Sequence, residues 1–114
     1  MINKLEVSKK AHNFCINIYQ ITNSFPKQEL FGITSQMRRA TVSVPLNIIE
    51  GQNRGTRKDF VRFLYIARGS LEEVRECLLL SKDLNYLKEN DYQKLEDQSS
   101  EISRMLNGLI KKLK

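Results

Sequence analysis

Cationic side chains gather in the middle of the chain, and their types and spacing point to binding chemistry. Residues 38–68 contain seven cations and two carboxylates, a charge of +5 in a chain of 114 residues whose net charge is +6. Guanidinium and ammonium groups attract phosphates, so this segment predicts a surface for the backbone of RNA or DNA. The candidate nucleic-acid-binding residues are Arg38, Arg39, Arg54, Arg57, Lys58, Arg62 and Arg68.

Most of these cations fall on one face of a predicted helix. At about 100° per residue, the five cations from Arg54 to Arg68 share an arc, with Tyr65 among them and an apolar stripe opposite. Arg57 and Lys58 stand in the first turn, where the macrodipole disfavours each by roughly a few tenths of a kcal/mol. A glycine-containing loop (51–55) and the free N–H groups there suit a phosphate. The alternative is a solvated face that only keeps the protein in solution.

Two later regions carry opposite charges, and residues 1–37 add a charge of +2. Residues 72–101 carry four cations and nine carboxylates, a charge of −5, and the C-terminal Arg104, Lys111, Lys112 and Lys114 add four cations. Cations suit a helix C-terminus, so no further role is predicted for the last four. The acidic stretch and the apolar residues beside it support a second hypothesis, a protein-interaction scaffold.

An enzyme is the third and weakest hypothesis. His12 is the only histidine and no Arg precedes it, which excludes helical ribonucleases that use an Arg followed closely by a His. Glu50 beside Asn47 could be a general base, but no nucleophile, second acid or metal-ligand set accompanies it. The sequence therefore predicts no catalytic residue, no metal site and no cofactor.

The two cysteines, Cys15 and Cys77, form no C-x-x-C or Cys/His spacing and sit in apolar patterns. We expect them to be small buried hydrophobic residues in a reducing compartment. The longest apolar run, residues 77–80, is far shorter than a membrane span, and no signal peptide is apparent. These features predict a cytoplasmic protein without a membrane partner.

The elements that must position these residues are helices. The chain has only 5 Gly and 2 Pro, and apolar residues recur at alternating spacings of four and three, as in Val7, Ala11, Phe14 and Ile18. Four such stripes predict an all-α, antiparallel up-down-up-down four-helix bundle in one domain, residues 1–114. The expected helices are roughly 3–24, 29–52, 56–84 and 88–112, with Thr56 as the N-cap of the third.

Apolar residues on the third helix extend beyond its heptad stripe. They are Val61, Phe63, Ile66, Cys77, Leu79 and Leu80. Some of them could widen the face within the bundle, but a second apolar face is also what a homo-oligomer needs. We therefore predict self-association.

Polar residues interrupt the stripe of the second helix. Pro45 removes a backbone hydrogen bond at a cost of about 3 kcal/mol unless the helix kinks. Asn47 and Glu50 follow on or beside the seam, and we expect them to bond to the third helix or to the loop before it. Gly69 and Ser70 offer a close-packing point on that helix.

These residues carry a resemblance to a known family. The stretch from Ser43 to Gly51, then Asn53-Arg54-Gly55, then the stretch from Phe60 to Glu73 resemble the four helix bundle protein family, also called the 23S rRNA-intervening sequence protein. The resemblance covers essentially the whole chain. The motif positions that read as structural are Pro45, Asn47, Glu50, Gly51, Gly69 and Ser70.

The resemblance implies a bacterial bundle that assembles with its own copies into ring-like pentamers with a basic surface. It also implies kinship with the accessory protein of diversity-generating retroelements, which binds a reverse transcriptase and nucleic acid. Of the motif positions, Arg54 is the one most able to touch phosphate. Gln52 and Asn53 depart from the family, since many members have a Gly nearer the Arg.

Overall fold

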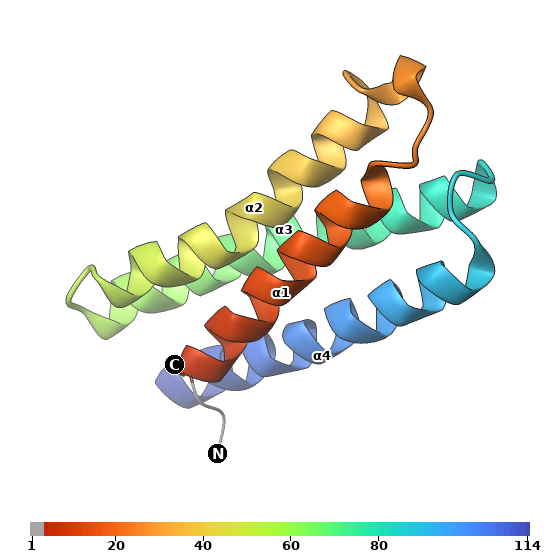
Figure 1. Cartoon of the computed structure of the whole chain (residues 1–114). Coiled ribbons are helices and arrows are strands. Elements are labelled where there is room, and N and C mark those ends of the chain that lie inside the picture. The colour runs from red at the N-terminus through yellow and green to blue at the C-terminus, as the bar shows by residue number, and fades with distance from the viewer. Residues whose placement is uncertain (1–3) are drawn as a thin grey trace.

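The computed structural model describes residues 4–114, which form four α-helices (Figure 1). These are α1 (Lys4–Thr22), α2 (Ile33–Gln52), α3 (Arg57–Asp83) and α4 (Glu89–Leu113), with a short 3-10 helix, η1 (Lys27–Glu29), between α1 and α2. The described residues contain no strand, so the prediction of an all-α chain with four helices is confirmed. The first predicted position, residue 3, lies outside the described residues.

The second helix begins later than predicted. The apolar spacing placed its start near Glu29, but residues 27–29 form η1 and α2 begins at Ile33. Gly32 separates the two elements with φ −110° and ψ −119°, a conformation that is not helical. The Glu29 carboxylate accepts a hydrogen bond from the backbone N–H of Ile33 at 3.3 Å and so satisfies one free donor at the start of α2.

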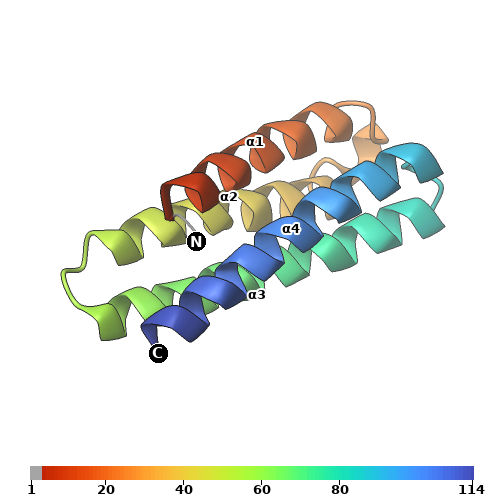
Figure 2. The same cartoon turned by 90° about the horizontal axis from the view of Figure 1, so that it is seen from below.

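Consecutive helices pack side by side and run in opposite directions (Figures 1 and 2). Cross-helix contacts agree: Ser43 of α2 meets Ser70 of α3 at 2.8 Å, while Gly51, later in α2, lies against Phe60, earlier in α3. Between α3 and α4, Arg68 contacts Asn107 and Arg75 contacts Glu96. The start of α3 therefore lies beside the end of α4.

The predicted stripes form the core. Burying each large aliphatic side chain contributes roughly 1.5–3 kcal/mol, so these stripes supply the main stabilisation. The least exposed large side chains include Phe14, Ile18, Met37, Ile48, Leu64, Leu71, Leu78, Ile102 and Leu106. In α2 the stripe predicted through Asn47 runs instead through Ile48, and Asn47 is only half-buried. None of the described helices is long and apolar enough to span a bilayer.

Two glycines of the family motif have opposite surroundings. Gly51 is buried where α2 and α3 approach closely, and a Cβ there would lie 2.8 Å from the Cβ of Phe63. Gly69 is exposed, with no heavy atom within 4 Å of where its Cβ would be. The prediction that Gly69 packs closely is therefore wrong, because it faces away from α2 while its neighbour Ser70 makes the contact.

The second apolar face that the sequence predicts on α3 is partly buried and partly exposed. Phe63 and Cys77 are buried within the chain, and Val61 packs partly against the core. Ile66, Leu79 and Leu80 remain exposed. Three of the six apolar side chains therefore widen the face that packs within the chain, and the other three lie on the surface.

Candidate nucleic-acid interface

The first half of α3 and the loop before it carry the cluster of cations that the sequence predicts. Thr56 caps α3, since its hydroxyl accepts a hydrogen bond from the Asp59 backbone N–H at 3.1 Å, as predicted. Gly55 turns the chain into this cap with φ +87°, a backbone conformation that favours glycine. We call the surface formed by the five cations of this region the basic face. Its members are Arg54, Arg57, Lys58, Arg62 and Arg68.

A phenyl ring organises one side of the basic face. The guanidinium carbons of Arg54 and Arg62 lie 5.0 and 4.5 Å from the ring centroid of Phe63, which is only 8% exposed. Cation–π attraction holds both groups near this buried ring. Glu50 also pairs with Arg54 at 2.8 Å, and Asp59 lies 3.8 Å from Arg62. The phenyl ring and one carboxylate therefore hold each guanidinium group in position, and its outer edge stays in solvent.

Tyr65 is the centre of a second cluster on the side toward α4. Arg68 lies over its ring at 4.7 Å and donates a hydrogen bond to the Asn107 amide oxygen at 3.0 Å. The Lys114 ammonium donates a hydrogen bond to the Tyr65 hydroxyl at 2.8 Å, which lowers the pKa of this phenol, with the nearby positive charges adding to the effect. Cations from α3 and α4 thus meet on one aromatic side chain.

The C-terminal lysines are the residues that sequence reasoning missed. Because α4 runs back along α3, its last turn lies beside the basic face, as the Lys114–Tyr65 contact shows. The signal for this was present in the antiparallel order of the helices, which places the end of the fourth beside the start of the third. The sequence prediction gave these lysines no role beyond the charge of a helix C-terminus, because it did not consider which helix lies beside them.

Arg38 and Arg39 do not join the basic face. They lie near the start of α2, toward the other end of the molecule from the α2–α3 loop (Figure 1). Arg38 connects α2 to the end of α1: its Nε donates to the Thr22 hydroxyl at 2.9 Å and its guanidinium lies 4.8 Å from the Tyr19 ring centroid. Sequence proximity grouped these two arginines with the others, but the length of α2 separates them.

The polar seam bonds mostly within its own helix. The Asn47 amide donates to the Ser43 carbonyl at 2.7 Å and to the Ser43 hydroxyl at 2.9 Å, and Ser43 in turn meets Ser70 of α3. The expectation of a direct bond from Asn47 to α3 is therefore wrong. Glu50 is exposed and pairs with Arg54 in the loop before α3, as expected. Pro45 lies inside α2, which continues to Gln52.

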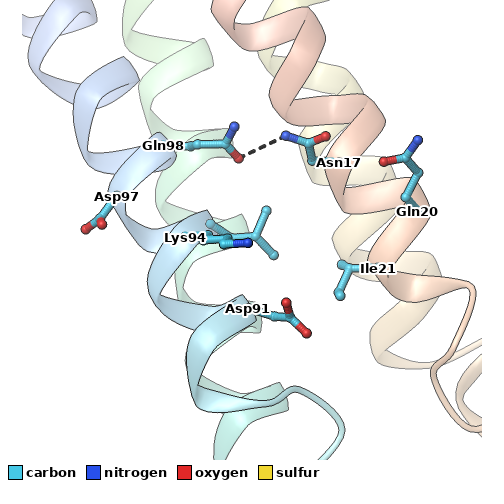
Figure 3. A pocket seen from close by; sticks show the side chains of 8 residues that line it. Asn17, Gln20, Ile21, Asp91, Lys94, Asp97 and Gln98 are labelled. Atoms are coloured by element: carbon cyan, nitrogen blue, oxygen red, sulfur yellow. Dashed lines mark hydrogen bonds between the residues drawn. The ribbon is translucent and has the colours of Figure 1, made fainter.

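A cleft between α1 and α4 is a second feature that the sequence did not indicate (Figure 3). This cleft is open to solvent and has a volume of about 650 Å³, and the Asn17 amide donates to the Gln98 amide oxygen across it at 3.1 Å. The other lining side chains are Gln20, Ile21, Asp91, Lys94, Leu95 and Asp97. Amides and mixed charges surround the cleft without a nucleophile and base in contact, so it offers no recognisable catalytic set.

The described residues are poorly suited to metal binding or to catalysis by a thiolate. No three His, Cys, Asp or Glu side chains of residues 4–114 come together to hold a metal ion. Both cysteines are free; Cys77 is buried and Cys15 half-buried. Burial raises the pKa of both thiols above the ordinary value, which keeps them protonated near neutral pH.

Comparisons with known proteins agree with the fold and the motifs. A crystal structure of a protein of unknown function from the S23 ribosomal protein family of Bacteroides thetaiotaomicron is 28% identical and superposes with a TM-score of 0.83. The match covers 92% of this chain and 98% of that one. No curated protein matches this sequence. The sequence profile of the 23S rRNA-intervening sequence protein matches residues 3–108, so the chain belongs to this family.

Proposed function

We propose that this protein is a non-catalytic, cytoplasmic nucleic-acid-binding protein that holds RNA or DNA by its phosphate backbone through the basic face. The observation that carries the proposal is the set of five cations on one exposed region of α3 and its loop. Four of them stand on a capped helix of 27 residues, which fixes their spacing, and Arg54 lies in the loop before it. Such an array neutralises phosphates and releases counterions, a recognition that needs no base contacts.

Arg57 and Lys58 are the sharpest part of this argument. Both are exposed, and neither forms an ion pair with a described residue. They occupy the first turn of α3, where each cation lowers helix stability by about 0.3–1 kcal/mol. A gain in phosphate binding offsets this cost in the proposed function.

The test measures fluorescence anisotropy of a structured RNA with the wild-type protein and with Arg57→Glu/Lys58→Glu at low and moderate salt. We expect tight salt-dependent binding by the wild type and a loss of about tenfold or more in the variant. The matched control is Lys27→Glu/Lys88→Glu, which changes the net charge equally at the opposite end of the molecule. Absence of wild-type binding at low salt, or equal losses in both variants, would contradict the proposal.

We also propose that the four helices form an up-down-up-down bundle that assembles with its own copies into a ring, a pentamer by family resemblance. Exposed apolar side chains on the outer side of α2 support self-association: Leu46 is 59% and Ile49 is 48% exposed. Ile66 on α3 is also exposed. A ring would repeat the basic face and multiply its phosphate contacts.

A protein-interaction scaffold is the second candidate function. The end of α3 combines exposed Leu79, Leu80 and Leu84 with the exposed carboxylates of Glu76 and Asp83, a surface suited to a basic partner with apolar anchors. A reverse transcriptase is such a partner by family resemblance. Affinity capture after nuclease treatment separates the two functions, because a directly bound protein survives it and an RNA-bridged one does not.

A further inference from the structure

We propose that Lys111 of α4 and Lys114, which follows its last turn, extend the basic face into a phosphate-binding surface on two helices, and that its ligand is a nucleic-acid duplex. This inference rests on the proposed function and specifies both the extent of its site and the class of its partner. It follows from the contacts between α3 and α4, from the orientation of the α4 lysines, and from the surroundings of the aromatic rings on this surface.

The contacts place the last turns of α4 against the basic face. Lys114 reaches Tyr65 at 2.8 Å, and Asn107, two turns earlier, accepts a hydrogen bond from Arg68 at 3.0 Å. Asn107 and the C-cap residue Lys114 therefore point toward the same side of α3. Lys111 lies between them, one turn after Asn107, and is exposed.

Lys112 points in another direction, although it is the neighbour of Lys111. It lies three turns after Glu101, whose carboxylate contacts the Lys10 ammonium of α1 at 3.2 Å, so it is on the side of α4 toward α1. Two of the three C-terminal lysines thus join the basic face and one does not. This difference supplies a matched internal control.

The combined surface carries its cations in two rows. Its α3 row, from Arg57 to Arg68, extends over about 16 Å at 1.5 Å per residue. Packed helices lie about 8–10 Å apart, which falls between the widths of the minor and major grooves of B-DNA, about 6 and 12 Å. Two rows of cations at this separation can contact phosphates on both strands that border a groove, whereas a single strand meets only one row.

The aromatic side chains of this surface are not available to stack on bases. Phe63 is buried beneath Arg54 and Arg62, and Tyr65 has Arg68 over its ring and Lys114 on its hydroxyl. Proteins that prefer single strands depend on open aromatic platforms. A rigid cationic surface with covered rings instead suits a duplex, whose bases are already stacked on one another.

The experiment compares three probes of equal length: an RNA duplex, the DNA duplex of the same sequence, and an unstructured oligouridine. Binding is measured by anisotropy across a salt series for the wild type, for Lys111→Gln/Lys114→Gln, and for the control Lys88→Gln/Lys112→Gln. Circular dichroism verifies that each variant is folded. The wild type should bind either or both duplexes at least about tenfold more tightly than the single strand.

The salt dependence identifies the lysines that touch phosphate. Each phosphate contact to a B-form duplex contributes about 0.9 to the slope of log K against log salt, so Lys111→Gln/Lys114→Gln should lower the slope by about 1.8. The control should lower it by less than about 0.5. Equal slopes in the two variants would overturn the role of α4, and equal wild-type affinity for oligouridine would overturn the duplex. A wild type that binds no probe would overturn the proposed function itself.

Discussion

At the scale of single residues, position in the helix decides what a glycine does. Gly51 and Gly69 are both positions of the family motif, and helix propensity disfavours both by about 1 kcal/mol relative to Ala. Gly51 compensates for this by letting α2 approach Phe60 and Phe63 of α3. Gly69 faces open space and gains nothing from the packing of its own chain.

We predict that Gly51→Ala lowers the free energy of unfolding by about 1–3 kcal/mol, because the new methyl group overpacks the α2–α3 contact. Gly69→Ala is the matched control and should raise it by about 0.5–1 kcal/mol through helix propensity. Urea denaturation of both variants measures the difference. If Gly51→Ala proves as stable as Gly69→Ala, the close approach of the two helices is not as described.

The two thiols make a second prediction at this scale. Burial is the largest cause of the raised pKa of both Cys15 and Cys77, with the carboxylates of Glu73 and Glu76 adding to it at Cys77. Since only the thiolate reacts, a disulfide reagent at pH 8 should modify both cysteines more slowly than free cysteine, and Cys77 more slowly than Cys15. Rates should rise as pH increases or when denaturant opens the fold. Fast modification of Cys77 in the native protein would contradict its burial.

At the scale of the helix, α3 begins with a favourable N-cap but carries two cations in its first turn, where the helix dipole disfavours them. Thr56 provides the cap and Asp59 suits the positive end of the macrodipole, while Arg57 and Lys58 oppose it. The same helix then connects to α4 through Arg75, which contacts Glu96 at 2.7 Å and Glu72 at 3.0 Å. These carboxylates hold the pKa of Arg75 above its ordinary value, Glu96 most strongly. The centre of α3 is thus fixed electrostatically, whereas its start carries charge that favours a ligand.

It follows that Arg57→Glu/Lys58→Glu should stabilise the folded protein by about 0.5–2 kcal/mol, because carboxylates suit the first turn of a helix. Thermal unfolding at low salt measures this, and the gain should shrink at high salt. Reduced RNA binding by a more stable variant would separate function from folding. A destabilised variant would show that the two cations support the fold through contacts within the protein.

At the scale of the whole molecule, charge and apolar surface occupy different regions. The basic face and the end of α4 lie together near the α2–α3 loop, and the acidic stretch runs along the second half of α3 and the first half of α4. The exposed apolar residues of α2, Leu46 and Ile49, form another surface. Leu46→Glu therefore alters the apolar surface of α2 without replacing a member of the basic face.

Light scattering at micromolar concentration should show an oligomer, and Leu46→Glu should shift it toward the monomer because a carboxylate opposes burial of this surface. Leu84→Glu, which alters an exposed leucine at the end of α3, is the control and should leave the oligomer intact. Dissociation by the control alone would place the contact on α3 instead. A monomeric wild type would exclude the ring.

The sequence by itself determined the four helices, the core and the cation cluster of α3. Each of these depends on local periodicity: the stripes of Phe14, Leu64 and Ile102 needed only helical spacing, and Thr56 needed only its position three residues before Asp59. The same holds for Arg57, Lys58 and Arg62, which share one helix and therefore one face.

Only the tertiary structure decided which distant residues meet. Arg38 and Arg39 are close in sequence to Arg54 but stand more than three helical turns from it, while Lys114 is far in sequence and touches Tyr65. The close fit at Gly51 and the open space at Gly69 could likewise not be predicted from the sequence, since both are glycines in helices. The physical reason is that a helix fixes the direction of a side chain relative to its own axis, and packing alone fixes what that direction faces.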